Sequence, residues 1–274
     1  MAPFTRLALV AMLASAAFAI PVITPPNPNG PTPALYEETN TYPDVPASPS
    51  PALFKRAVES GVIMTCSRPG MVAITFDDGP FLYTNQLLDI LKAKKVKATF
   101  FLNGDNNGHI KDYEAVVKRA YKEKHQIASH TWSHTDLTTL DEKGILDEMN
   151  KLDDAIKGMI GVRPIYMRPP FGSRNPFVKD VLTKNGYEIV IWDQDTNDWQ
   201  HPDDVNKSLK VYKTVLGRKN EIKKNGHIFL QHDTHKATAL QLAPQAIDYA
   251  LSKGFKVVTL GECLGKGRSK WYRK

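Results

Sequence analysis

The chain has 274 residues, of which 36 are Lys or Arg and 29 are Asp or Glu, so its formal net charge is +7. Apolar residues make up 42% of the chain, which suits one domain with a full hydrophobic core. The cations accompany no helix-turn-helix, zinc knuckle or stacking motif, so we expect no nucleic acid partner. The excess of positive charge favours binding to an anionic wall surface, or it simply keeps the protein in solution.

Residues 1–19 have the pattern of a secretory signal peptide. Arg6 precedes an apolar run at residues 7–18, and Ala17-Phe18-Ala19 forms a small-x-small cleavage site. The run is too short to span a membrane and no later stretch is long enough, so we expect no membrane span. The mature protein is predicted to be secreted, either extracellular or associated with the cell wall.

Residues 20–56 are rich in Pro, Thr, Asn and Ser and show little helical or strand periodicity. Such a segment buries too little apolar surface to offset its chain entropy, so we predict a linker or pro-segment. It ends at Lys55-Arg56, a dibasic pair of the kind that kexin-like processing proteases cut. Removal of this segment and its retention are both compatible with the sequence.

Residues 57–274 are predicted to form one domain, with Cys66 and Cys263 near its two ends. In an oxidising compartment two such thiols usually pair, the alternative being two free buried thiols. A bridge across so long a loop stabilises the fold by roughly 5 kcal/mol in chain-entropy models. Asn206 begins the sequon Asn-Lys-Ser, so we predict a surface glycan there.

Apolar runs alternate with amphipathic runs along this domain, which is typical of a parallel sheet covered by helices. In chain order we predict a strand at 72–76, a helix at 85–95, strands at 98–102 and 126–129 around a helix at 112–124, a helix at 141–159, a strand at 165–167, a helix at 175–185, a strand at 188–192, a helix at 204–224, a strand at 227–231, a helix at 237–252 and a strand at 256–259. Polar motifs follow the strands, as they do in α/β barrels. We therefore predict an α/β fold, a (β/α) barrel, with a doubly wound open sheet as the alternative.

Asp77 and Asp78 follow the first apolar strand and precede Gly79-Pro80. Neighbouring side chains on a regular strand point to opposite faces, so both carboxylates reach one site only if the chain turns there. The Gly-Pro pair supplies such a turn. One carboxylate is then a metal ligand and the other a general base; the alternative is a polar turn that caps the next helix.

His130 and His134 are four residues apart and are predicted to lie on one face of a helical turn, where both imidazoles reach one ion. Two imidazoles and one carboxylate leave positions open for water and substrate, which fits a catalytic zinc site. The same set serves non-haem iron oxygenases, but those need a jelly-roll-like strand pattern that this chain lacks. Two solvated helix histidines are the remaining alternative.

Three later segments carry further candidate groups. Arg168 begins a rigid Arg-Pro-Pro-Phe-Gly loop, where it can pair with a carboxylate while the Phe171 N–H faces a developing oxyanion. Trp199 offers a flat apolar wall. His232 ends a strand, and beside an acid it can be held protonated and act as a general acid. Taken singly, each segment also fits an ordinary turn or surface position.

Together and in this order, the segments T-F-D-D-G-P, H-T-W-S-H, R-P-P-F-G, D-T-N-D-W and L-Q-H resemble the polysaccharide deacetylases, the NodB-like carbohydrate esterase family. The resemblance covers residues 66–263, and the residues around both cysteines resemble those of secreted fungal chitin deacetylases. It implies a distorted (β/α) barrel that hydrolyses N-acetyl groups from N-acetylglucosamine units of chitin or chito-oligosaccharides. Acetate and chitosan are then the products, and the cofactor is one divalent metal, Zn²⁺ in the first place and Co²⁺ in the second.

Carried over residue by residue, the resemblance implies a metal site and an acid–base pair. The implied metal ligands are Asp78, His130 and His134. Asp77 is then the general base and His232 the general acid. Arg168 holds Asp77 in place, while Asp198 pairs with His232 and raises its pKa.

The resemblance also implies contacts with the substrate. Trp199 and Leu230 line a pocket for the acetyl methyl group. Phe171 stands where the family often has Tyr, and its contribution is a backbone N–H directed at the oxyanion, which the change of side chain preserves.

The motifs serve acetyl chemistry and do not separate the polymers on which it acts. A peptidoglycan N-acetylglucosamine deacetylase and an acetylxylan esterase of the same family are therefore alternatives. A non-catalytic wall protein that binds carbohydrate on the same fold is a more remote one, since Asp77 and His232 are both present. We expect the protein to be a monomer.

Overall fold

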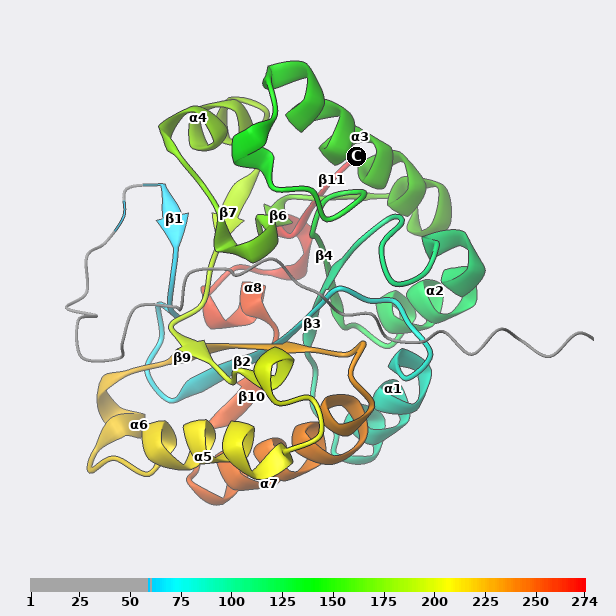
Figure 1. The fold of residues 1–274 in the computed structure, drawn as a ribbon. Coiled ribbons are helices and arrows are strands. Elements are labelled where there is room, and N and C mark those ends of the chain that lie inside the picture. The colour runs from blue at the N-terminus through cyan, green and yellow to red at the C-terminus, as the bar shows by residue number, and fades with distance from the viewer. Residues whose placement is uncertain (1–58, 60) are drawn as a thin grey trace, which may run out of the picture. The chain divides into compact units, whose positions relative to one another are not determined.

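The computed structural model describes Glu59 and residues 61–274 (Figure 1). The predicted signal peptide, residues 1–19, and the predicted Pro-rich segment, residues 20–56, lie outside the described residues. Both stay predictions, as does the start of the domain at residue 57.

The centre of the fold is a sheet of parallel strands. Neighbouring strands follow the order β1 (Val62–Ile63), β7 (Glu188–Val190), β6 (Tyr166–Met167), β4 (Gln126–Ser129), β3 (Thr99–Leu102), β2 (Met71–Asp77), β9 (His227–His232) and β8 (Gln194–Asp195). β10 (Lys256–Val258) pairs with the beginning of β2, and β3 pairs with the end of β2 on the same side. β3 and β4 are buried along their whole length, as strands of a parallel sheet that is covered on both faces are.

The sheet curls so strongly that one short connection, residues 191–193, forms hydrogen bonds near both edges of the sheet. β7 lies beside the end strand β1, β8 is the other end strand, and residues 191–193 connect β7 to β8. In this connection the N–H of Ile191 donates to the Ile63 carbonyl of β1, and the N–H of Asp193 donates to the Ile228 carbonyl of β9. The predicted distorted (β/α) barrel is therefore confirmed. A doubly wound open sheet keeps its end strands apart, so that alternative is wrong.

Helices surround the curled sheet (Figure 1). The surrounding helices are α1 (Thr84–Ala93), α2 (Glu114–Lys122), α3 (Glu142–Ile160), α4 (Pro176–Lys184), α5 (Val205–Leu216), α6 (Glu221–Lys224) and α7 (Ala243–Ser252). A short helix, α8 (Leu260–Cys263), lies instead in the middle of Figure 1 and packs against the inner face of the sheet. In Figure 1, α1 and α2 lie to the right, α3 and α4 at the top, and α5, α6 and α7 at the bottom. A small antiparallel pair, β5 (Arg163–Pro164) and β11 (Tyr272–Arg273), joins the C-terminal residues to the chain after α3. Between residues 61 and 274, no helix has both the length and the apolar character that a membrane crossing requires.

Side-chain alternation along β2 separates the helix-covered face of the sheet from the inside of the barrel. Val72 and Phe76 pack into the apolar cluster formed with α1, α5 and α7. Ala73 belongs instead to the inner cluster, so Asp77, four residues further along the strand, also faces inward. β9 runs in register with β2 and places His232 opposite Asp77. The fold thus brings two polar side chains together at the carboxyl ends of neighbouring strands.

Most predicted elements are confirmed, but one predicted helix is divided. The helix predicted over residues 204–224 ends at Leu216 and resumes at Glu221, because Asn220 adopts a left-handed backbone (φ 62°) that a right-handed helix excludes. The helix predicted over residues 237–252 is confirmed as continuous, and it contains a π-helical turn, Thr238–Leu242, directly before α7. The two-residue strands β1 and β8 are not predicted, since they are too short to show a period.

Asn206 of the predicted glycosylation sequon is exposed in the first turn of α5. An exposed side chain is what attachment of a glycan requires. Its glycosylation stays a prediction.

Cys66 and Cys263 form a disulfide with their Cα atoms 5.0 Å apart, so the predicted pairing is confirmed and the free-thiol alternative is wrong. The bridge joins the segment before β2 to α8, across a sequence separation of 197 residues. Gly226 packs directly against it: a Cβ there would come within 2.7 Å of the Cys66 Cβ and 2.3 Å of the Arg68 carbonyl oxygen. Only a glycine allows β9 to begin this close to the bridge.

We expect the double variant Cys66→Ala/Cys263→Ala to fold with a lower free energy of unfolding, because its unfolded chain regains the entropy that the bridge removes. The loss should approach roughly 5 kcal/mol, the chain-entropy value for a loop of this length. Guanidinium unfolding measures it, with the wild-type protein in reducing buffer as the matched control. An unchanged unfolding midpoint in non-reducing buffer would contradict a stabilising role for the bridge.

Candidate metal centre and active site

The candidate site lies at the carboxyl ends of β2 and β9. Asp77 ends β2, and its register partner His232 ends β9. The next residue, Asp78, has a left-handed backbone (φ 72°), and a cis peptide bond joins Gly79 to Pro80. The predicted turn is confirmed, and it begins at Asp78 itself. Two adjacent carboxylates therefore reach one site, although neighbours on a regular strand point apart.

Asp78, His130 and His134 form a cluster whose ligand atoms all lie within 4.8 Å of one another. Asp78 Oδ1 lies 3.4 Å from Nε2 of both histidines. That oxygen is buried and has no hydrogen-bond partner in the described part of the chain. Burying a carboxylate oxygen without a donor is unfavourable unless a cation neutralises it, so these residues fit a divalent metal. Three protein ligands leave positions for water and substrate, as in catalytic zinc sites.

The two histidines do not lie on a helix, so the predicted helical turn is wrong. Residues 130–136 form neither helix nor strand, and Thr131 and His134 have left-handed backbones (φ 72° and 57°). The Asn103 side chain donates from Nδ2 to the carbonyls of His130, at 2.5 Å, and Thr131, at 3.0 Å. An irregular loop stabilised by an amide side chain, and not helical spacing, brings the two imidazole centroids to 4.9 Å.

Each of the two imidazoles can present a nitrogen to a bound ion. His130 Nδ1 lies 2.7 Å from the Arg168 carbonyl oxygen, which can only accept, so the proton is assigned to Nδ1 and Nε2 is free to ligate. Burial lowers the pKa of His134 to about 4, although the Asp78 carboxylate opposes this shift. For Asp78 itself, burial disfavours the charged form, but the charge of the surrounding imidazoles, that of His232 among them, outweighs burial and holds the pKa of its carboxyl well below the usual range.

Asp77 is held by a buried arginine. Arg168 Nη1 donates to Asp77 Oδ1 at 2.6 Å and to Thr75 Oγ1 at 2.8 Å, and its Nη2 donates to the Ile191 carbonyl at 3.1 Å. Arg168 is fully buried, so these contacts form away from water. The other carboxylate oxygen, Asp77 Oδ2, faces His130 Nε2 at 3.7 Å. One oxygen of Asp77 is thus fixed, and the other is directed at the metal cluster.

His232 is paired with a buried carboxylate from the loop after β8. Its Nδ1 lies 2.9 Å from Asp198 Oδ1, and its backbone N–H donates to Asp198 Oδ2 at 2.7 Å. The Thr238 hydroxyl donates to the same Oδ2 at 2.9 Å. Burial disfavours the imidazolium, but the carboxylates of Asp198, Asp78 and Asp77 outweigh it and raise the pKa of His232 to about 10. The imidazole therefore carries a proton at neutral pH.

Three predicted apolar residues lie on the segments that carry these polar groups. Leu230 is 4% exposed and precedes His232 by two residues on the inner face of β9, whereas Trp199 and Phe171 are 40% and 51% exposed. The Phe171 ring lies edge-on to His134 with the centroids 4.6 Å apart, and the Phe171 backbone is left-handed (φ 57°). The sequence-predicted residues therefore lie on segments that meet at one end of the barrel, and their individual roles stay predictions.

Thr75, Asn103 and Thr238 support the site and are not predicted from the sequence. Thr75 lies two residues before Asp77 on the same face of β2, so strand alternation could have identified it. Asn103 directly follows β3 and so lies at the same end of the barrel as the candidate site. This position could have identified it as a site residue. Thr238 lies in the π-helical turn before α7, and no local pattern points to it.

Asp233 and Thr84 hold the turn that follows Asp78. The Thr84 hydroxyl donates to Asp233 Oδ2 and accepts from the Phe81 N–H at 2.8 Å. A Cβ at Gly79 would come within 2.5 Å of Asp233 Oδ1, so the turn needs glycine at this point. Burial raises the pKa of Asp233 to about 7.

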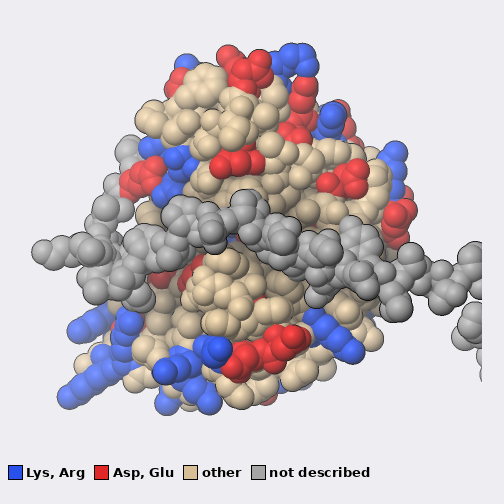
Figure 2. Space-filling model, in the orientation of Figure 1, with Lys and Arg blue, Asp and Glu red and all other residues tan. Residues whose placement is uncertain are grey.

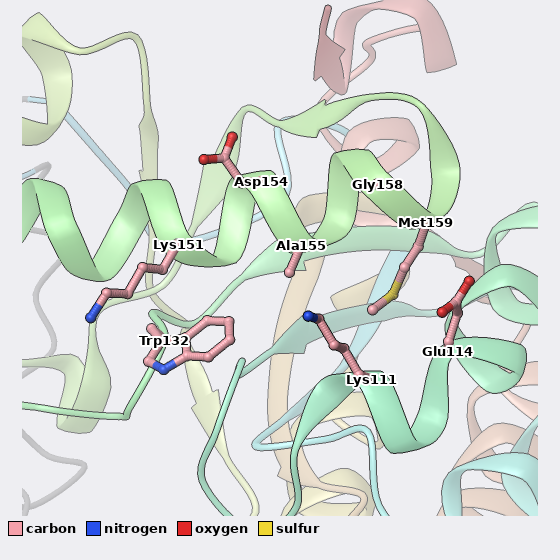
Figure 3. A pocket seen from close by; sticks show the side chains of 8 residues that line it. All are labelled: Lys111, Glu114, Trp132, Lys151, Asp154, Ala155, Gly158 and Met159. Atoms are coloured by element: carbon pink, nitrogen blue, oxygen red, sulfur yellow. The ribbon is translucent and has the colours of Figure 1, made fainter.

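A separate hollow of about 540 Å³ lies beside the histidine loop (Figure 3). Trp132, from that loop, lines it together with side chains of α3 and with Lys111 and Glu114. None of the three metal-cluster residues lines this hollow. The hollow and the candidate metal centre therefore share a loop and are different sites.

The model of the polysaccharide deacetylase family matches residues 65–190. A chitin deacetylase of Pestalotiopsis sp. is 44% identical over 218 residues, which are 79% of this chain and 72% of that one. A probable peptidoglycan-N-acetylglucosamine deacetylase of Arthroderma benhamiae is 45% identical over 77% of this chain, but over 48% of its own length. The solved structure of the chitin deacetylase from Colletotrichum lindemuthianum aligns with a TM-score of 0.75 and 37% identity, covering 79% of this chain and 97% of that one. The chain belongs to the polysaccharide deacetylase family.

We expect Asp78→Ala to weaken Zn²⁺ binding by at least about 100-fold, because even residues that only support metal ligands contribute up to that factor. Calorimetric titration of the metal-stripped protein measures the affinity. Asp105→Ala, which removes an exposed carboxylate from a neighbouring loop, is the matched control and should bind as the wild type does. Equal affinities in both variants would show that the ion does not bind at this cluster.

Proposed function

We propose that this protein is a secreted, metal-dependent chitin deacetylase. It removes N-acetyl groups from N-acetylglucosamine units of chitin or chito-oligosaccharides, releasing acetate and leaving chitosan. The observation that carries this proposal is the meeting of three groups at one end of the barrel: the metal cluster, the free oxygen of Asp77 and the protonated imidazole of His232. Similarity to fungal proteins named chitin deacetylase supports the choice of substrate.

Asp78, His130 and His134 would hold the metal. Two nitrogen ligands and one oxygen ligand favour Zn²⁺, and Co²⁺ is the second ion that such a set accepts. When bound, the ion supplies Lewis-acid polarisation of the acetamide carbonyl and makes its water more acidic.

Asp77 acts as the general base in this proposal. Arg168 occupies Oδ1, so Oδ2 is the oxygen that takes a proton as water attacks the acetamide carbon. The Phe171 N–H donates to the acetamide oxygen as negative charge develops there, an interaction worth about 3 to 4 kcal/mol in comparable sites.

His232 acts as the general acid. Asp198 holds Nδ1, so the proton that leaves is the one on Nε2. The C–N bond breaks as this proton moves to the departing nitrogen, which becomes the free amine of glucosamine. Trp199 and Leu230 line the space for the acetyl methyl group.

The residues named here recognise the acetyl group and not the polymer that carries it. The same chemistry suits N-acetylglucosamine units of peptidoglycan, and one relative at 45% identity carries that activity in its name. Acetylxylan is a third substrate of this kind. A non-catalytic wall-binding protein has no need of a buried arginine that orients a carboxylate beside a metal cluster, so that alternative is disfavoured.

Secretion is proposed from the predicted signal peptide together with the Cys66–Cys263 disulfide. Disulfides persist in oxidising compartments and are rare in the cytosol.

The experiment that tests the function is acetate release from chitohexaose, peptidoglycan fragments and acetylxylan in parallel, with chelator and after addition of Zn²⁺ or Co²⁺. We expect metal-restored acetate from chitohexaose at the highest rate. Faster acetate release from peptidoglycan or acetylxylan would make that polymer the substrate in place of chitin and would leave the proposed mechanism unchanged. No acetate from any polymer, with metal bound, would overturn the proposal in favour of a binding protein.

The charge of Asp198 should set the alkaline limit of activity. His232 works in its protonated form, which is present below its raised pKa and is lost as pH rises through that value. Asp198→Asn removes the charge that raises this pKa, so the alkaline limb of kcat/KM should move to lower pH. Asp203→Asn, at an exposed position nearby, should leave the profile unchanged. An alkaline limb that stays in place in Asp198→Asn would argue against His232 as the acid.

A further inference from the structure

Exposed cations gather at the end of the barrel opposite the candidate active site. They lie on four segments, residues 67–70, 217–226, 253–256 and 264–267, which precede or adjoin the amino ends of β2, β9 and β10 and follow α8. The exposed cations are Arg68, Arg218, Lys219, Lys223, Lys224, Lys253, Lys256 and Lys266, and we call them the basic face. In Figure 2, Lys and Arg gather at the lower left, where α6 lies in Figure 1.

Contacts between these segments make the basic face continuous. The N–H of Gly70 donates to the Asn225 carbonyl at 3.0 Å, and the N–H of Lys256 donates to the Gly70 carbonyl at 2.9 Å. A Cβ at Gly265 would lie 3.0 Å from Arg68 Nε, so the fourth segment touches the first. Cations that are far apart in the sequence therefore share one surface.

The charges of the basic face are not balanced within the protein. Across residues 61–274, none of its eight members forms an ion pair with a carboxylate. Glu221 lies among them but is buried, and it is hydrogen-bonded to His227 and Asn225. Glu262 is exposed, and its carboxylate accepts from Thr259 at the start of α8. A surface of like charges attracts polyanions.

Helix dipoles explain only part of this distribution. Cations stabilise the carboxyl ends of helices, where Lys223, Lys224 and Lys253 lie. Lys266 likewise follows the carboxyl end of α8, but Arg68 and Lys256 lie away from helix ends of this kind, so no helix dipole accounts for them.

We propose that the basic face binds an acidic polysaccharide and thereby holds the enzyme on a wall. Among the described residues, no exposed large apolar side chain belongs to the four segments. The face therefore has no aromatic platform for the bases of single-stranded nucleic acid and no apolar side chain to insert into a lipid surface. The choice of a polysaccharide over other polyanions also rests on the proposed function, which places the protein among wall polymers.

The length of β9 separates this docking surface from the chemistry. β9 begins at His227, directly after the segment 217–226, and ends at His232 in the candidate active site. A strand rises by about 3.3 Å per residue, so the two ends lie roughly 17 Å apart. Charges more than about 10 Å apart are largely screened at 0.1 M salt. A polymer bound to the basic face thus leaves the active site open to a separate, neutral chitin chain.

The test uses polygalacturonate as the acidic polysaccharide and dextran as the neutral one. The variant neutralises one segment of the face: Arg218→Gln/Lys219→Gln/Lys223→Gln/Lys224→Gln. The matched control neutralises four exposed cations of α1, α2 and α3: Lys92→Gln/Lys122→Gln/Lys151→Gln/Lys157→Gln. Dissociation constants are measured at several salt concentrations, and acetate release from chitohexaose is measured on the same samples.

We expect the wild-type protein to bind polygalacturonate but not dextran, with an affinity that falls as salt rises. The basic-face variant should lose at least tenfold in affinity, while the control stays within twofold and both release acetate at the wild-type rate. Equal losses in both variants, or none in the basic-face variant, would overturn the proposal. Tighter binding to duplex DNA or to phosphatidylserine vesicles than to polygalacturonate would also overturn it. A protein that binds polygalacturonate as predicted but releases no acetate would overturn the proposed function and not the docking.

Discussion

Arg168 is one buried residue that contacts both Asp77 and His130. Its guanidinium fixes Asp77 Oδ1, and its backbone carbonyl accepts the proton of His130 Nδ1. The guanidinium lies 4.1 Å from the centroid of the Phe101 ring, which closes the space around it. A buried ion pair contributes little net stability, because desolvating both charges offsets their attraction. The pair is therefore better understood as an orienting contact, because the same residue fixes the positions of Asp77 and His130 relative to each other.

The sheet makes this arrangement possible. The inner face of the barrel is apolar near the disulfide, where Ala73 lies, and becomes polar toward the carboxyl ends of the strands, where Asp77 and His232 pair in register. A left-handed residue at Asp78 then turns a second carboxylate toward the same point. Opposite charges meet at this end, whereas unbalanced cations collect at the other. The candidate active site thus lies at one end of the barrel and the basic face at the other, and the length of the strands determines the distance between them.

The sequence predicts which residues meet at this site because they directly follow strands, and buried strands are easily recognised as apolar runs. Asp77, Asp78 and His232 are found in this way. His130 and His134 meet Asp78 as predicted, but the helical turn predicted for them is wrong, because a spacing of four residues fits a helix as well as a loop with two left-handed residues. Thr238 and the break between α5 and α6 depend on tertiary contacts and single backbone conformations that no periodicity records.

The central claim is that Asp77 is a base and Asp78 a ligand, although the two are adjacent. Bound metal and acetate release, measured on the same sample of Asp77→Asn, test it most directly. We expect a full equivalent of bound metal with turnover reduced by at least about 100-fold, since a general base contributes on that order. Loss of the metal from Asp77→Asn, or turnover close to that of the wild type with the metal bound, would contradict it.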